Sequence, residues 1–310
     1  MDTAVNFPTT PGAVKASALA LKRKMTAEQA FQAIARSCLA QIQANEAGVD
    51  KFHDVECLHQ MRVGLRRLRS ALSMYRELLS LPVEVANDLE WLLAQLGPAR
   101  DWDVLAGSTL PKVGAAAQTP ELVALTMAAL EKTHALHHAA AEAIASERYR
   151  QLMLALSTWV NERAWRAGVS RKVKQRLKGK VERFAEQVLA ADQKRLLRRG
   201  AQLRSATPEA RHRVRIAAKK TRYAAEFFGS LYKEQRVKPY VKALTHLQDE
   251  LGWMNDVAVA DGLLEELARG QVELRGGIDT ARALLAAGAE DDGARTHKAW
   301  KRFAPMKAPR

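Results

Sequence analysis

The chain has 310 residues, with 49 Lys and Arg against 34 Asp and Glu, a formal net charge of +15 and 47% hydrophobic residues. This length can form one large domain or two of ordinary size, and the hydrophobic share is enough for a packed core. Two cysteines, Cys38 and Cys57, exclude a disulfide framework and are expected to be buried small hydrophobes. No run approaches about 18 apolar residues, so we expect no membrane insertion.

The first 24 residues are predicted to form a mobile tail. Their Ala/Leu stretch, residues 16–21, lacks a preceding basic region and is followed by Lys22, Arg23 and Lys24. Because a signal peptide has the opposite order, the sequence favours a cytoplasmic protein.

Capping residues mark the starts of several predicted helices. Thr26-Ala-Glu-Gln29 forms a capping box before an Ala-rich helix that extends to about residue 45. Thr119-Pro120 and Thr207-Pro208 each place a capping Thr before a Pro at the first helical position. Leu96-Gly97-Pro98 predicts a break or kink in the helix that contains it.

Helical patterns cover most of the remaining chain, and no segment has the alternating, β-branched pattern of a strand. The fold class is therefore predicted as all-α, built of antiparallel helical bundles. The other predicted helices span about 53–81, 83–105, 121–167 with a split near Ser146, 171–204, 237–269 and 272–287.

The excess positive charge is concentrated in residues 163–222. This window holds 20 Lys and Arg and only four acids, so it carries +16, while the rest of the chain carries −1. Folding must leave this charge where water or a polyanion can reach it, because unpaired buried cations are too costly. A helix face that serves only solubility is the alternative, but the concentration of charge favours a polyanionic ligand.

An internal repeat places part of the charge in two equivalent rows. Leu58-His-Gln-Met-Arg-Val-Gly-Leu-Arg-Arg-Leu-Arg69 has a counterpart 153 residues later, Arg211-His-Arg-Val-Arg-Ile-Ala-Ala-Lys-Lys-Thr-Arg222. Downstream, Leu96-Gly-Pro-Ala-Arg-Asp101 recurs as Leu251-Gly-Trp-Met-Asn-Asp256 at an offset of 155. Two motifs in the same order predict a duplicated helical unit.

Helical spacing separates a basic face from a core stripe in each copy. At about 100° per residue, four residues of the first copy share one narrow face, with Arg67 to its side: His59, Arg62, Arg66 and Arg69. The opposite stripe of the first copy is apolar and comprises Met61, Leu65, Leu68, Leu72 and Tyr75. Its counterparts in the second copy have smaller side chains and are Val214, Ala218, Thr221, Ala225 and Phe228. Phosphate suits the basic face, because Arg binds its oxygens with two parallel hydrogen bonds. Pairing with acids on a neighbouring helix, Asp101 and Asp256 among them, is the alternative.

These motifs resemble the CHAD family, the conserved histidine α-helical domain. The resemblance rests on His59-x2-Arg62-x3-Arg66-Arg67-x-Arg69, its copy at His212, both Leu-Gly segments and the C-terminal Ala299-Trp-Lys-Arg-Phe303. It implies a domain over residues 25–304, with halves of about 25–167 and 168–304 and a tail over 305–310. It further implies two pseudo-symmetric helical bundles whose basic faces meet at a central cleft or pore. Binding of inorganic polyphosphate, often at polyphosphate granules, is also implied.

The resemblance can be carried over position by position. It implies ten polyphosphate contacts: His59, Arg62, Arg66, Arg67, Arg69, His212, Arg215, Lys219, Lys220 and Arg222. The acid at Asp103 is replaced by Ala258 in the second copy, which argues against a metal or catalytic role for these acids. No metal site, no cofactor and no catalytic residue is therefore predicted.

Two other functions fit the residues less well. Nucleic acid would also meet the basic surface, but only Tyr223 lies in the two cationic faces to stack on bases. A phosphoryl-transfer enzyme with His59 or His212 as nucleophile would need a positioned acid or metal, and none is evident near either histidine. His134, His137 and His138 lie close together on one predicted helix, and His134 and His138 have the i,i+4 spacing of some zinc sites. No third ligand is obvious, so the three histidines are predicted to form a solvent-facing cluster.

Overall fold

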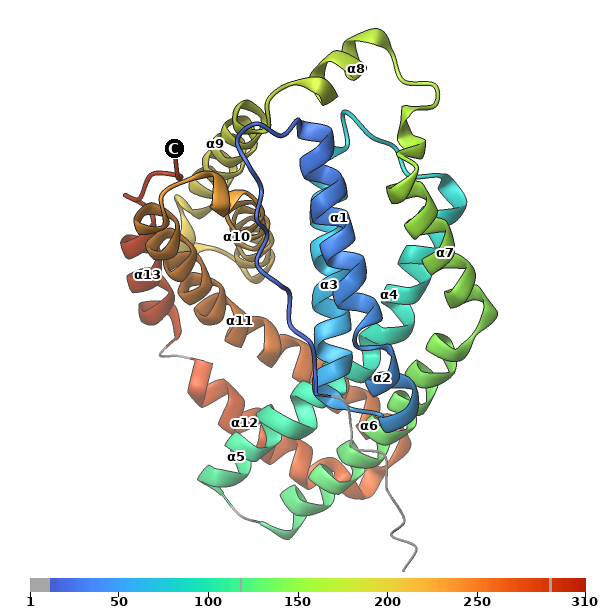
Figure 1. Cartoon of the computed structure of the whole chain (residues 1–310). Helices are drawn as coiled ribbons and strands as arrows, with labels where there is room; N and C mark the ends of the chain where they lie inside the picture. Colours follow the sequence, from blue (N-terminus) through green and yellow to red (C-terminus); the bar gives the residue numbers. More distant parts are fainter. Residues whose placement is uncertain (1–11, 118, 290–291) are drawn as a thin grey trace, which may run out of the picture.

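The computed structural model describes residues 12–117, 119–289 and 292–310, and these form an extended N-terminal segment followed by helices and short connections, with no strand (Figure 1). The all-α class is thereby confirmed. No described helix combines the length and apolar composition that a bilayer span requires. The helices are α1 (Ala27–Gln43), α2 (Glu46–Phe52), α3 (Val55–Tyr75), α4 (Val83–Val104), α5 (Leu110–Ala116), α6 (Pro120–Ala145), α7 (Glu147–Asn161), α8 (Arg171–Lys178), α9 (Val181–Gly200), α10 (Pro208–Phe228), α11 (Glu234–Gly270), α12 (Arg275–Ala289) and α13 (Asp292–Phe303).

The predicted helix starts are confirmed where a capping side chain marks them. At α1, Gln29 N donates to Thr26 Oγ1 at 3.2 Å, and Thr26 N donates to Gln29 Oε1 at 2.9 Å. Thr119, Ser146 and Thr207 cap α6, α7 and α10 with their hydroxyl oxygens. Short polar side chains thus fix these boundaries locally, because they satisfy amides that the first turn leaves unpaired.

A break or kink is predicted at Leu96-Gly97-Pro98, and the break does not occur, since α4 continues through Pro98 to Val104. The kink stays a prediction. Leu96 and Ala99, on either side of the proline, are both fully buried. Their packing outweighs the one helical hydrogen bond that proline removes. The irregularity comes later, as a π-helical turn, η1 (Leu105–Thr109), that leads into α5.

The helix predicted over 171–204 is divided into α8 and α9 by Gly179 and the residue after it. Here the chain pairs with the start of α1 instead of continuing the helix. Ala27 N donates to Gly179 O at 2.8 Å, and Val181 N donates to Met25 O at 3.0 Å. These two bonds tie the segment that follows the first predicted half back to the beginning of that half.

Helix α3 ends at Tyr75, before the predicted end at residue 81. The following residues form a turn in which Leu78 N donates to Tyr75 O at 2.7 Å. Leu78 and Leu79 are buried in the first core described below, so leaving the helix brings two further apolar side chains inside.

The first core lies among α1, α3, α4 and α7. Phe31 of α1 packs against the rings of Tyr75 and Trp165, at centroid distances of 4.9 and 5.1 Å. The Tyr75 hydroxyl is satisfied inside the core, because it donates to Ala27 O at 3.0 Å. Phe227 and Phe228, from the end of α10, belong to the same core, so the two predicted halves pack against each other.

The second core lies among α9, α10, α11 and α13. Tyr240 and Phe303 are fully buried with their ring centroids 5.5 Å apart, which makes the C-terminal aromatic motif a packing element. Residues beyond α13 remain attached to the bundle, since Ala308 N donates to Gln193 Oε1 at 2.7 Å.

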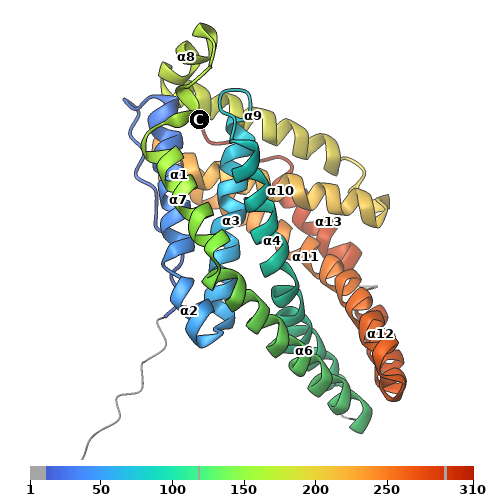
Figure 2. The same ribbon diagram turned by 90° about the vertical axis from the view of Figure 1, so that its right-hand side faces the viewer.

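The third core lies where α5 and α6 meet α12 and the C-terminal part of α11 (Figure 2). Leu125 of α6, Leu264 of α11 and Ile278 of α12 are at most 1% exposed. Because α6 comes from the first predicted half and α12 from the second, this core joins both halves. The two copies of the repeat share their cores, and their pseudo-symmetry stays a prediction.

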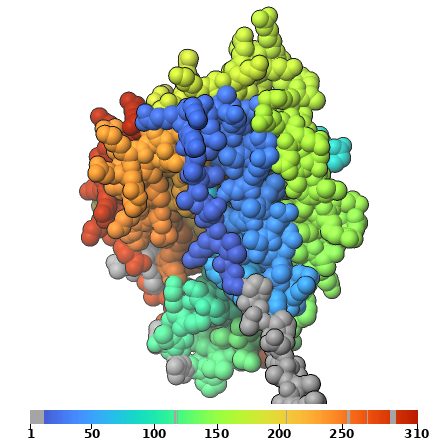
Figure 3. Space-filling view, viewed as in Figure 1, coloured from blue at the N-terminus to red at the C-terminus, as the bar shows by residue number. Residues whose placement is uncertain are grey.

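Residues 12–24, predicted as part of a mobile tail, lie extended along the surface between the first bundle and the α10–α11 pair (Figure 3). Val14 N donates to Asn45 Oδ1 and Asn45 Nδ2 donates to Val14 O, both at 2.9 Å. Leu21 N donates to Ser230 Oγ at 2.9 Å. These bonds fasten the segment at two points, so the prediction is wrong for residues 12–24, which we call the N-terminal strap. Residues 1–11, the rest of the predicted tail, lie outside the described residues.

Candidate functional site

A cleft of about 330 Å³ opens between α3 and α10, the two helices that carry the basic rows. Residues of α4, η1 and α11 complete its walls, and it adjoins the third core through Leu105 and Ala260, which belong to both. Its charged or titratable lining comprises His59, Arg62, Arg66, Arg100, Asp101, Arg215, Lys219 and Asp256.

Both copies of the repeat contribute to this cleft. The predicted contacts that line it are His59, Arg62 and Arg66 from α3, with Arg215 and Lys219 from α10. On the other side of each helix the predicted core stripe is buried: Met61, Leu65, Val214 and Ala218 have no exposed surface. Helical spacing therefore explains how one face enters the core while the other carries charge to the cleft.

The backbone of α4 holds Arg62 at the cleft wall. Arg62 Nη1 donates to Leu93 O at 3.4 Å, and a Cβ at Gly97 would lie 3.4 Å from the same nitrogen. Glycine at this position leaves room for the guanidinium against the helix. The Leu-Gly motif, interpreted above as a break or kink, thus leaves the space beside α4 that the Arg62 guanidinium occupies.

Positive charge outnumbers negative charge in the cleft. Five cations, one of them Arg100, face two carboxylates, which leaves an excess of three positive charges. Arg215 Nη2 lies 3.9 Å from Asp256 Oδ1, the edge of ion-pair range. Burial raises the pKa of Asp101, Arg62 opposes this shift, and Asp256 adds to it. The two acids repel each other and cannot neutralise the cleft.

Burial also makes the positive charges of the cleft unfavourable in the free protein. It lowers the pKa of Lys219 to about 8, with further lowering by Arg215 and Arg66. It lowers the pKa of His59 to about 4, helped by Arg100, so this imidazole is neutral near pH 7. It lowers the pKa of Arg62 to about 10 despite Asp101, which leaves the guanidinium charged. An anion carrying several charges would stabilise all of these groups in their protonated forms.

Arg67 and Arg222, two further predicted contacts, lie outside the cleft and share one carboxylate. Arg67 Nη1 donates to Glu226 Oε2 at 3.0 Å, and Arg222 Nη1 donates to Glu226 Oε1. Arg67 is 6% exposed and lies over the Phe227 ring at 4.9 Å. These arginines join α3 to α10 at the place where the two helices pack.

The remaining three predicted contacts also lie outside the cleft. Arg69 makes an exposed ion pair with Glu90 at 3.1 Å, and Lys220 Nζ donates to Ser73 Oγ at 3.2 Å. His212 is exposed and does not line the cleft. Their assignment as polyphosphate contacts stays a prediction.

Arg100 is the cationic cleft residue that the sequence analysis missed. It directly precedes Asp101 in the first Leu-Gly motif, but the second copy has Asn255 at that place, so the repeat could not single it out. Its Nη1 also lies 3.9 Å from Oδ2 of the buried Asp103.

Asp103 pairs with a histidine that was predicted to face solvent. Its Oδ1 lies 2.8 Å from His137 Nε2, and His137 is 3% exposed. The prediction of a solvent-facing cluster is therefore wrong for His137, because a buried carboxylate holds its ring, while His134 and His138 are exposed. Within the described ranges, no group of three or more His, Cys, Asp or Glu side chains is arranged to hold a metal ion.

Comparison with known proteins agrees with the motifs. The family model described as the CHAD domain matches residues 33–265. The crystal structure of the CHAD domain from the plant Ricinus communis is 39% identical, with a TM-score of 0.87 over 96% of this chain and 99% of that chain. PptA from Streptomyces chartreusis has a similar fold, with a TM-score of 0.62 at 16% identity over 91% of this chain and 100% of that chain. No curated protein matches the sequence. The chain belongs to the CHAD domain family.

Proposed function

We propose that the cleft between α3 and α10 binds inorganic polyphosphate. The observation that carries the proposal is the excess of three positive charges on half-buried side chains that converge from both copies of the repeat. The arginine guanidinium groups can donate paired, directed hydrogen bonds to phosphate oxygens, and the lysine ammonium attracts the same oxygens as a compact positive charge. The CHAD family is associated with polyphosphate. Association with polyphosphate granules in the cytoplasm is part of the same proposal.

Nucleic acid is the competing ligand, and the composition of the cleft argues against it. Proteins that bind single strands without sequence preference usually offer aromatic rings on which bases stack. The cleft lining contains no Phe, Tyr or Trp among the described residues. A ligand that consists of phosphate throughout needs no such platform.

We further propose that binding is not accompanied by catalysis. The pKa of His59, lowered to about 4 by burial, keeps its imidazole neutral, as a nucleophile must be, but a leaving phosphate would also need an acid or a metal to receive charge. Incubation of the protein with long-chain polyphosphate should release no orthophosphate. Release that disappears in a His59→Ala/His212→Ala variant would instead establish an enzyme.

The central experiment compares two variants that lose the same charge. Arg62→Ala/Arg66→Ala/Arg215→Ala/Lys219→Ala removes four cations from the cleft. The control, Lys172→Ala/Lys174→Ala/Arg183→Ala/Arg198→Ala, removes four exposed cations from the same basic stretch of sequence. Binding of labelled polyphosphate should be abolished in the first variant and nearly unchanged in the second. Equal affinities for the two variants would show that bulk charge, and not the cleft, holds the ligand.

Competition separates the two ligand classes. Excess single-stranded or duplex nucleic acid, matched in phosphate concentration, is added to the labelled complex at about 0.15 M salt, where exposed charges are screened beyond about 8 Å. The proposal expects that unlabelled polyphosphate displaces the label far more effectively. A preference for nucleic acid would overturn it.

A further inference from the structure

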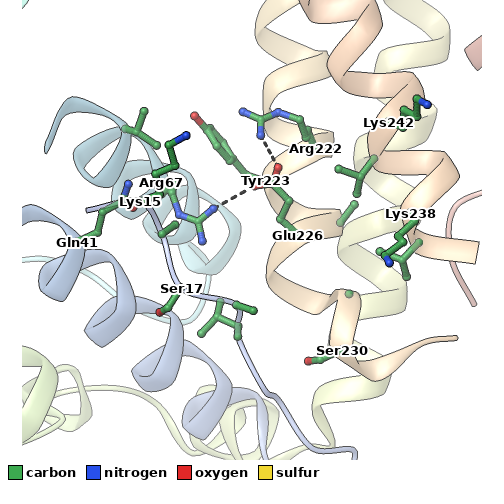
Figure 4. Close-up of a pocket in the computed structure, with 18 of the residues that line it drawn as sticks. Lys15, Ser17, Gln41, Arg67, Arg222, Tyr223, Glu226, Ser230, Lys238 and Lys242 are labelled. Atoms are coloured by element: carbon green, nitrogen blue, oxygen red, sulfur yellow. Dashed lines mark hydrogen bonds and ion pairs between the residues drawn. The ribbon is translucent and has the colours of Figure 1, made fainter. Parts of the chain in front are cut away.

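A second cavity, of about 830 Å³, lies between α3, α10, α11 and the N-terminal strap, and we call it the strap groove (Figure 4). It shares no lining residue with the cleft. Its volume falls within the range of pockets that hold drug-sized molecules, about 300–1,000 Å³. The polyphosphate proposal makes no use of this space.

The strap forms one wall of the groove and is held there at both ends. Asn45 binds Val14 at one end, and Ser230 binds both the amide and the carbonyl of Leu21 at the other. Arg23 adds two hydrogen bonds to Leu231 O, each at 3.2 Å. This wall is therefore in place before any ligand arrives, which lowers the entropic cost of binding.

The floor of the groove contains an acid that is already neutralised. Both Glu226 oxygens accept from arginines, one from Arg67 and the other from Arg222, and Figure 4 shows one guanidinium group reaching this carboxylate from α3 and the other from α10. Five cations line the groove against two acids, which leaves an excess of three positive charges. Lys15 and Lys242 form no ion pair within the part of the chain that the structure describes.

The cations without an ion pair and the aliphatic side chains lie toward different ends of the groove. Figure 4 shows Lys15 beside Arg67, and Leu21 is bonded to Ser230 further along α10, so the strap runs in the same direction as α10 and Lys15 lies toward Arg222. Arg222 Nε donates to Gln248 Oε1 at 3.1 Å, so α11 returns antiparallel and Lys242 is nearer to this end than Val237 is. Toward the other end Lys238 pairs with Glu234, with Nζ 2.6 Å from Oε1, and Leu19 and Val237 add aliphatic side chains to the walls. Val241 lies between the two ends.

We propose that the strap groove binds a single-chain organic anion, with its charged head near Lys15 and Lys242 and its hydrocarbon tail along the strap toward Leu19. The five strap residues of the wall span about 13 Å when extended, which suits a medium-chain carboxylate. Burying the tail against aliphatic side chains stabilises the complex, and the ammonium groups select a charged head over a neutral one.

Decanoate is the probe, titrated into the full chain by calorimetry below its micelle concentration. Val241→Trp fills the middle of the groove, where the tail would pass, and Lys15→Glu/Lys242→Glu reverses the charge at the head-group end. The controls are Leu154→Trp, at an α7 side chain that is 69% exposed, and Lys172→Glu/Lys174→Glu, which makes the same change in net charge. Thermal melts verify that each variant is folded.

Decanoate should bind the parent and both controls saturably, bind Lys15→Glu/Lys242→Glu at least about tenfold more weakly, and fail to bind Val241→Trp. Decanol, which lacks the charge, should bind more weakly than decanoate. The proposal is overturned if the parent shows no saturable binding, or if both groove variants bind like the parent. If phosphatidylglycerol vesicles capture the protein but monomeric decanoate does not bind, the proposed anion site is wrong and the groove instead contacts a membrane surface. Polyphosphate affinity should be the same in Val241→Trp and the parent, so the two proposals fail separately.

Discussion

Arg66 and Arg67 are adjacent in α3 but line different cavities: Arg66 the cleft, and Arg67 the strap groove, where its Nη1 lies 3.0 Å from Glu226 Oε2. A step of about 100° separates the two side chains around the helix. One arginine therefore has an unneutralised environment suited to a ligand, and the other has a structural partner on α10.

Replacing these two arginines with alanine should affect different properties, stability in one case and polyphosphate binding in the other. Arg67→Ala removes a buried charged hydrogen bond and should lower the free energy of unfolding by about 2–4 kcal/mol, because Glu226 keeps only Arg222. Arg66→Ala should instead weaken polyphosphate binding. Urea unfolding and a binding titration measure the two effects. Arg69→Ala, which breaks an exposed pair, serves as the control and should change stability by less than about 0.5 kcal/mol. A larger binding loss for Arg67→Ala than for Arg66→Ala would contradict this division of roles.

Polyphosphate affinity should fall as the pH rises above about 8. The pKa of Lys219 is lowered to about 8 by burial, so the free protein loses this charge in that range, while a bound anion favours the protonated amine. Binding should therefore take up a proton, which calorimetry in two buffers of different ionisation enthalpy detects. Lys219→Arg keeps its charge and should show a flatter profile. Identical pH profiles for the parent and Lys219→Arg would exclude Lys219 as the titrating group.

Acid should destabilise the free protein through His59. Its pKa is lowered to about 4 in the folded state, below the value of about 6.5 for an unfolded chain. The unfolded state therefore binds the proton first, and stability is lost as the pH falls from about 6.5 toward 4. His59→Gln should reduce this slope in thermal melts, and saturating polyphosphate should reduce it in the parent. His246→Gln, at a side chain that is 47% exposed, is the matched control, and an equal change of slope in the two variants would contradict the role of His59.

Two glycines in helices should respond oppositely to alanine. A Cβ at Gly200 would lie 2.2 Å from the Trp300 ring, so Gly200→Ala should cost about 1–3 kcal/mol or more by overpacking the second core. Nothing lies within 4 Å of a Cβ at Gly262, which is exposed in α11, so Gly262→Ala should stabilise by about 0.5–1 kcal/mol. Chemical denaturation measures both values, and a stabilising Gly200→Ala would refute the close packing of α9 against α13.

The sequence predicted the parts of this molecule that depend on local chemistry. Capping side chains such as Thr26 and Ser146 marked helix boundaries, because their hydrogen bonds involve residues only a few positions away. Helical spacing identified the core stripe and the face that enters the cleft. The repeat also predicted that Arg215 and Lys219 share a basic face, and both line the cleft.

The features that the sequence could not predict are those that only tertiary contacts decide. Pro98 stays within α4 because its neighbours are buried, and residues 12–24 are fixed by partners such as Ser230, about 200 positions away in sequence. Arg69 shares the predicted face with Arg66 yet pairs with Glu90, since a helical wheel gives direction around the axis but not which helix lies opposite. His137 is buried for the same reason, because Asp103 on another helix receives its ring.

The third core adjoins the cleft and is made by helices from both predicted halves. Neither half could fold alone without exposing side chains such as Leu125 or Ile278 to water. The two halves that carry the basic faces on α3 and α10 are thus joined by one shared core, so the distance between them cannot vary freely. Heat should therefore unfold both halves in one cooperative transition, and separately expressed halves should need each other to become soluble.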